Sequence, residues 1–109
     1  MPRKEERKSL SMKALLKIAE GGLQFRRRYN VGLSDISSHG CRIVTQGIRL
    51  TAGERIVLKP EDLESISCTV RWATNEFAGV EFDHALHPAV VEHLCRLHPG
   101  KDQATLTLA

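Results

Sequence analysis

Apolar and polar residues alternate along the first third of this chain, and this period of two limits its fold more than any other feature. Between residues 10 and 18 the apolar side chains are Leu10, Met12, Ala14, Leu16 and Ile18. Residues 23–33 alternate in the same way. Successive side chains of a β-strand point to opposite faces, so the pattern predicts two half-buried strands. The stretch AEGG at residues 19–22 supplies glycines for a hairpin connection between them.

Four shorter strands are predicted after this hairpin, at residues 41–45, 54–60, 66–74 and 78–82. In the third of these, the face that we expect to be buried carries Ile66, Cys68, Val70 and Trp72. All the connections are shorter than the crossover that parallel neighbours need, so the sheet is expected to be antiparallel. Six short antiparallel strands predict a closed or nearly closed barrel, because closure leaves few unpaired edges.

Residues 88–98 have helical spacing instead. Pro88 suits the first helical position, Gly100 lies beyond the end, and the apolar stripe consists of Val90, Val91, Leu94 and Leu97. A chain of 109 residues has room for one domain. We therefore predict an all-β fold at residues 10–98, a six-stranded antiparallel barrel with one C-terminal α-helix. Residues 1–9 are expected to be a flexible basic segment, and residues 99–109 a loose tail.

The charge and the cysteines restrict the class of protein. The net charge is +3, with basic residues concentrated at residues 2–8 and 25–28. Such an excess suits an anionic partner, whether a nucleotide, a nucleic acid or an acidic membrane surface, although it also serves simply to keep a small domain soluble. Three widely spaced cysteines and no apolar targeting segment favour reduced thiols and a cytoplasmic protein. No apolar run reaches the length of a membrane span.

The stretch DISSHG, at residues 35–40, is the first candidate for a binding site. It lies between the second and third strands, where we expect its polar groups to be on the barrel surface. Asp35 supplies an acceptor and Ser37 a hydroxyl group. Gly40 allows either a positive φ or the close approach of another molecule to the backbone.

The stretch RKEER near the N-terminus is the second candidate, and it places Arg3 and Arg7 four residues apart. A guanidinium group offers a planar fork of donors that can bind phosphate or the edge of guanine. A flexible segment with two such groups, able to fold over a polar turn, predicts a clamp for a guanine nucleotide.

In their order and separation, these two motifs resemble the R-x-x-x-R and [D/N]-x-S-x-x-G signature of PilZ domains, the bacterial receptors for cyclic di-GMP. The stretches VRW and AGVEF and the terminal helix are similar as well, so the resemblance covers roughly residues 3–98. It implies a PilZ-type barrel that binds cyclic di-GMP. Arg3 and Arg7 would contact guanine and phosphate. Asp35 and Ser37 would anchor the nucleotide from the barrel, and Gly40 would permit the turn.

The resemblance also suggests how a nucleotide signal would leave the chain. No output domain is recognisable in the sequence, so we expect a stand-alone receptor that passes the signal to an unidentified effector protein. No cofactor and no metal are expected, because the histidine and cysteine spacings fit no metal motif.

Other readings of the same residues remain open. Asp35 and Ser37 could simply close a turn, and the two arginines could belong to a solvated tail. An enzyme is not expected, because neighbours two residues apart cannot easily place the imidazole of His39 between the other two groups of a triad. Two alternatives to the receptor are kept: a PilZ-like protein-interaction adaptor without nucleotide binding, and a small barrel that binds single-stranded nucleic acid weakly. The shortage of exposed aromatic residues makes nucleic acid an unlikely partner.

Overall fold

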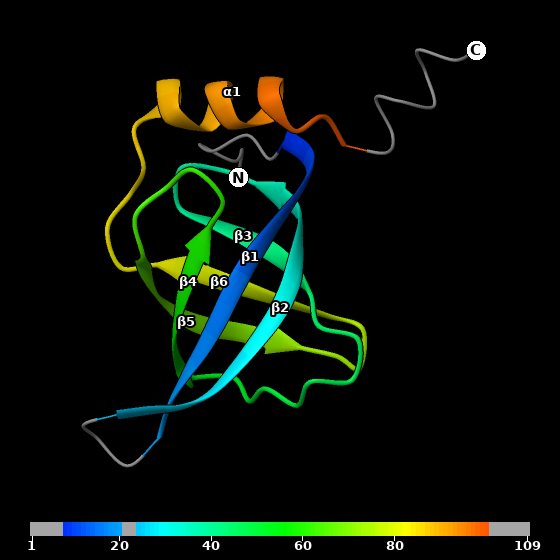
Figure 1. Cartoon of the computed structure of the whole chain (residues 1–109), viewed down its shortest axis with the longest axis vertical. Coiled ribbons are helices and arrows are strands. Elements are labelled where there is room, and N and C mark those ends of the chain that lie inside the picture. The colour runs from blue at the N-terminus through cyan, green and yellow to red at the C-terminus, as the bar shows by residue number, and fades with distance from the viewer. Residues whose placement is uncertain (1–7, 21–23, 101–109) are drawn as a thin grey trace, which may run out of the picture.

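The chain folds into a closed antiparallel barrel of six strands with one helix across its end (Figure 1). The computed structural model describes residues 8–20 and 24–100. Its elements are β1 (Lys8–Glu20), β2 (Gln24–Ile36), β3 (Gly40–Val44), β4 (Arg55–Pro60), β5 (Ile66–Ala73), β6 (Phe77–Phe82) and α1 (Pro88–Leu97). Around the barrel the strands follow the order β1-β2-β3-β6-β5-β4, and every neighbouring pair is antiparallel. The predicted fold class is confirmed.

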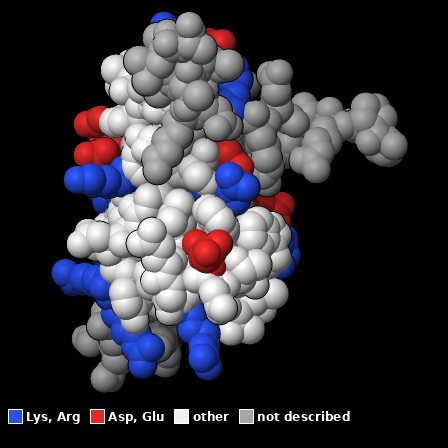
Figure 2. Space-filling view, turned by 90° about the vertical axis from the view of Figure 1, so that its right-hand side faces the viewer, with Lys and Arg blue, Asp and Glu red and all other residues white. Residues whose placement is uncertain are grey.

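The long first strands define both the core and the far end of the molecule. All five alternating apolar residues of β1 are buried, as their spacing predicts. Beyond Ile18, which pairs with Ile56 of β4, β1 and β2 continue as a two-stranded hairpin that projects below the barrel in Figure 1. Residues 19 and 20, predicted to belong to the connection, are the last two residues of β1, and residues 21–23 lie outside the described part of the chain. Two cations, Lys17 and Arg28, pair directly between β1 and β2 just before this projection, and Figure 2 shows several basic side chains toward that end.

Helix α1 packs on the end of the barrel at which β1 begins. His87 caps its first turn, because the Nδ1 atom accepts a hydrogen bond from the backbone N–H of Ala89 at 3.0 Å, and Pro88 occupies the first helical position as predicted. After the helix the chain runs back onto β1. The backbone N–H of Ser11 donates to the carbonyl of His98 at 3.0 Å, and Leu10 forms a bridge with Pro99.

Two apolar residues lie on the surface although their spacing predicted burial. Trp72 is 45% exposed, because the pairing of β5 with β6 shifts register between Val70 and Trp72 and so reverses the alternation. Leu97 is 52% exposed, and Cys95 takes the predicted place of that side chain in the buried stripe of α1. The stripe therefore drifts toward Cys95 at the end of the helix, leaving Leu97 at its margin.

Candidate functional site

The turn formed by residues 35–40 closes the end of the barrel beneath α1 (Figure 1). Asp35 is among the last residues of β2, and Gly40 is the first of β3. The turn is closed by the backbone N–H of Ser37, which donates to the carbonyl of Gly40 at 2.8 Å. These contacts place the whole motif on one rigid connection between two barrel strands.

Ser37 holds this turn from inside, which corrects the expectation that its hydroxyl group lies on the surface. The side chain is completely buried. Its Oγ accepts a hydrogen bond from the N–H of His39 at 3.2 Å and donates to the carbonyl of Gly40 at 3.4 Å. A short polar side chain that bonds the backbone two and three residues ahead is typical of turns built on serine. In this structure Ser37 shapes the turn.

Gly40 is required by a neighbouring strand. A Cβ atom at this position would overlap the backbone carbonyl oxygen of Val80 and would lie 3.3 Å from its carbonyl carbon. Among the described residues, the glycines with positive φ are Gly47 and Gly53, so Gly40 does not need the left-handed conformation. The close approach anticipated from the sequence is that of β6 within the barrel, rather than that of another molecule.

Asp35 faces the outside of the barrel, where it is paired with a cation. It lies opposite Arg42 of β3, and its Oδ2 is 3.5 Å from the Nε of Arg42. The same Nε donates to Ser34 Oγ at 2.9 Å, and the guanidinium lies 4.9 Å from the ring centroid of Phe77. The carboxylate is thus an oriented acceptor, with an arginine beside it that the sequence motifs did not include.

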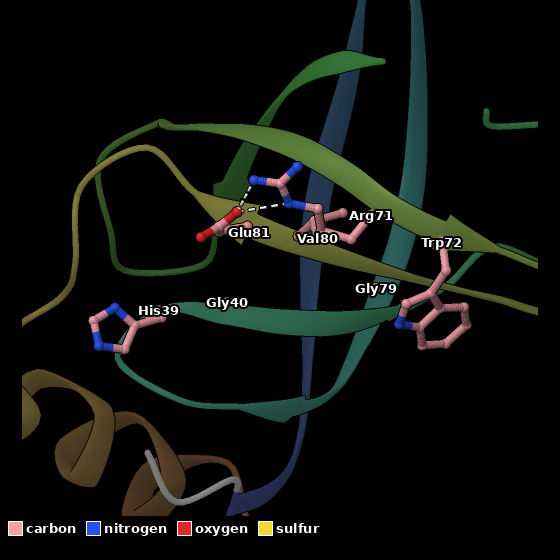
Figure 3. Close-up of a pocket in the computed structure, with 7 residues that line it drawn as sticks. All are labelled: His39, Gly40, Arg71, Trp72, Gly79, Val80 and Glu81. Atoms are coloured by element: carbon pink, nitrogen blue, oxygen red, sulfur yellow. Dashed lines mark hydrogen bonds and ion pairs between the residues drawn. The ribbon is translucent and has the colours of Figure 1, made fainter. Parts of the chain in front are cut away.

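A shallow groove crosses the outer face of β3, β6 and β5 next to the turn. Its volume is about 290 Å³, and its lining is His39, Gly40, Arg71, Trp72, Gly79, Val80 and Glu81 (Figure 3). His39 and Trp72 lie at opposite ends, and the ion pair between Arg71 and Glu81 lies between them. Gly40 and Gly79 contribute no side chains, so the backbone forms part of the floor.

Trp72 is the functional candidate that sequence reasoning missed. Its indole lies against the backbone of Gly79. The ring is so close that a Cβ atom at Gly79 would overlap the ring nitrogen. Strict alternation assigned Trp72 to the core, and only the register shift places it at the groove. A usable signal was present in the sequence, since a tryptophan in one strand and a glycine in the next form a pair in which the ring can cover the bare backbone.

Arg3 and Arg7 lie outside the described residues, so their side chains cannot be placed. The described chain nevertheless starts next to them. Lys8, which follows Arg7, pairs with Ile36, and Ser9 pairs with Asp35. Since Ile36 immediately precedes Ser37, the covalent structure brings the end of the RKEER stretch to the same end of the barrel as the DISSHG turn.

The described residues offer little for covalent chemistry. All three cysteines are buried. Burial raises the pKa of the Cys68 thiol to about 12, and the nearby carboxylate of Asp83 acts in the same direction. Burial also raises the pKa of Cys95. Thiols whose pKa is raised in this way stay protonated at neutral pH and are poor nucleophiles.

Neither a metal cluster nor a membrane helix is found within residues 8–20 and 24–100. In that part of the chain, no three His, Cys, Asp or Glu side chains come together as metal ligands would. Nor is any helix there both long and apolar enough to span a membrane.

A small barrel with an exposed polar and aromatic groove beside a glycine turn has the features of a binding domain. Comparison with protein families agrees, because the model of the PilZ domain matches residues 2–97. The chain belongs to the PilZ family, whose members are binding and receptor domains for cyclic di-GMP rather than catalytic ones. A comparison with curated proteins gave no match.

Proposed function

We propose that this protein is a receptor for cyclic di-GMP that binds the nucleotide at the DISSHG turn and relays the signal to a protein partner. The observation that carries this proposal is the pairing of Lys8 and Ser9 with Ile36 and Asp35. Because Lys8 follows Arg7 in the chain, this pairing ties the end of the RKEER stretch to the residues of β2 that lead into the turn.

The chemistry of the motifs, the turn and the neighbouring groove together supports a planar, anionic ligand. Arg3 and Arg7 supply the forks of donors that match guanine O6 and N7 or a phosphate. On the barrel, Asp35 is an acceptor for guanine N–H groups, and Arg42 beside it adds positive charge. The exposed indole of Trp72 presents a flat surface on which a base can stack. Gly40 and Ser37 fix the shape of the turn.

Titration calorimetry with cyclic di-GMP tests the proposal, with cyclic di-AMP, GTP and a short single-stranded oligonucleotide as competitors. We expect cyclic di-GMP to bind most tightly, because adenine replaces the O6 acceptor with an amino group that faces the arginine donors. Arg7→Ala should weaken binding by about 1.5–3 kcal/mol through the loss of charge-assisted hydrogen bonds. The melting temperature should hardly change.

The matched control is Arg28→Ala, which removes an exposed arginine from the β1–β2 hairpin, away from the turn. Equal losses in Arg7→Ala and Arg28→Ala that vanish in moderate salt would identify nonspecific attraction. If millimolar cyclic di-GMP gives no heat of binding, the receptor hypothesis is rejected in favour of the adaptor that binds no nucleotide. If the oligonucleotide binds more tightly than cyclic di-GMP, it is rejected in favour of a nucleic-acid-binding barrel.

Trp72 provides an intrinsic reporter, because it is the single tryptophan of the chain and it lines the groove. We expect saturating cyclic di-GMP to quench or shift its fluorescence, since a stacked base changes the surroundings of the indole. Gly79→Ala should lift the ring from β6 and reduce this response several-fold. Gly32→Ala is the control, because a Cβ atom there meets other atoms only at ordinary contact distances of 3.8 Å or more. A full calorimetric signal with unchanged fluorescence would exclude Trp72 from the site.

A further inference from the structure

A second groove, which the nucleotide proposal does not use, lies between two loops beside α1. Its volume is about 440 Å³. One wall is the β4–β5 loop at residues 61–65, and the other is the connection from β6 to α1 at residues 83–87, which runs alongside it in Figure 1. The apolar part of the lining consists of Leu63, Ile66, Leu86 and Val90, all only partly buried. We call this feature the loop groove.

Hydrogen bonds hold the walls of the loop groove in place. Arg55 of β4 forms two bonds with Asp83, at 2.9 and 2.6 Å to its two carboxylate oxygens. The backbone N–H of Asp83 donates to the carbonyl of Ser67 at 2.9 Å. At the base of the β4–β5 loop, the N–H of Leu63 donates to the carbonyl of Pro60 at 3.3 Å. Such a groove exists before any partner arrives, which reduces the ordering cost of binding.

The wall formed by the connection from β6 to α1 is hydrogen-bonded to the DISSHG turn. The N–H of Leu86 donates to the carbonyl of Ser38 at 2.8 Å, and the N–H of Phe82 donates to the carbonyl of His39 at 2.8 Å. Ser38 and His39 are two of the three variable positions inside DISSHG. A ligand that shifts the turn therefore acts on the loop groove through two short backbone contacts.

The charge at the loop groove indicates the chemistry of its occupant. The acidic lining residues are Glu64 and Asp83, and Arg55 already balances the charge of Asp83. The exposed carboxylates of Glu61 and Asp62 lie in the same loop as Glu64, so this loop is acidic in a chain whose net charge is +3. Partly exposed apolar side chains with a charged rim are typical of a protein-docking surface.

We propose that the loop groove docks a segment of a partner protein that presents apolar side chains together with lysine or arginine, and that nucleotide at the DISSHG turn changes the affinity. The apolar side chains of the segment fill the space over Ile66, Leu86 and Val90, and its cations meet the acidic loop. The proposal that a partner segment docks here rests on the loop groove alone. The coupling to nucleotide rests on the proposed receptor function.

The probe is a fluorescein-labelled peptide of four leucines and four lysines, compared with the same peptide in which glutamate replaces lysine. Fluorescence anisotropy at physiological salt measures their affinities for the full chain. We expect the lysine peptide to bind at least tenfold more tightly than the glutamate peptide. Equal binding of the two peptides, or no binding of the lysine peptide at millimolar protein, would overturn the proposal.

A pair of helix variants separates docking from general charge. Val90→Arg places a cation and extra volume in the loop groove, whereas Ala89→Arg adds the same charge at the next, exposed position outside the lining. We expect Val90→Arg to bind the lysine peptide at least tenfold more weakly than Ala89→Arg. Equal affinities refute docking at this site. If Val90→Arg does not fold, Glu64→Lys with Glu92→Lys as its control makes the same comparison on exposed positions.

Adding cyclic di-GMP to the peptide titration tests the coupling. We expect the peptide affinity to change at least threefold at saturation, and the nucleotide affinity to change by the same factor when peptide is present, since coupling between sites is reciprocal. No change, with both ligands bound, would refute the coupling. If the peptide docks but cyclic di-GMP does not bind, the docking proposal is supported and the receptor function is rejected. Nucleotide binding with equal peptide affinities for Val90→Arg and Ala89→Arg would reject docking alone.

Discussion

Replacing Val70 with aspartate is expected to unfold the domain. Val70 lies in β5, is completely buried, and pairs with Val80 of β6. A carboxylate at this position would lie within the apolar core of the barrel, where ionisation without a partner is costly and even the protonated acid leaves polar atoms without hydrogen bonds. The expected loss is about 4 kcal/mol or more, which is comparable to the whole stability of a small domain. Circular dichroism should show the strand signal lost or a much lower melting temperature.

Two control variants separate burial of charge from other effects of the substitution. Val70→Ala removes volume but adds no polar group, so it should cost less than Val70→Asp. Gln46→Asp introduces a carboxylate at an exposed turn position with φ of 47°, a conformation that aspartate tolerates, and should change stability by less than about 0.5 kcal/mol. A Val70→Asp protein that melts like Gln46→Asp would show that the inward face of β5 is assigned wrongly.

Replacing Gly40 with alanine is expected to produce the second-largest loss, at least about 3 kcal/mol, because the added methyl group overlaps backbone rather than a movable side chain. To accept the methyl group, β3 must move away from the carbonyl of Val80. This movement breaks the pairing of β3 with β6 at the DISSHG turn. For a domain of this size, that loss corresponds to a fall in melting temperature on the order of 10 °C or more.

Gly32→Ala is the matched control for this substitution. Gly32 also lies in a barrel strand, but a Cβ atom there would be 3.8 Å from its nearest neighbour. Alanine should be neutral or slightly stabilising at this position, because it restricts the unfolded chain. If Gly40→Ala were as stable as Gly32→Ala, the glycine of the motif would owe its place to ligand contact alone, and the structural role assigned to it here would be wrong.

The residues of the DISSHG motif therefore do different work, although they stand together in the sequence. Ser37 and Gly40 shape the turn, one by bonding its backbone from inside and the other by admitting β6. Asp35 is the member that faces outward, next to Arg42. We expect Asp35→Ala to act on nucleotide affinity more than on folding, which is the reverse of the expectation for Gly40→Ala.

The sequence by itself determined the architecture of the barrel. The alternation from Leu10 to Ile18, the short connections and the proline at the first helical position each act locally, through strand periodicity, chain length and fixed φ. None of these needs knowledge of distant neighbours. The two motifs also stand next to strand ends that pair with each other, since Lys8 and Ser9 of β1 pair with Ile36 and Asp35 of β2.

Only the tertiary structure decided which of these side chains lie on the surface and which are buried. Trp72 reached the surface because β5 shifts register against β6, and a one-residue shift moves a side chain to the opposite face of a sheet. Ser37 was buried, and Gly40 was required, because β6 and the chain before α1 pack against the turn. The loop groove exists only because two loops separated in the chain by β5 and β6 converge. These features depend on contacts between residues far apart in the chain, and local patterns carry no information on such contacts.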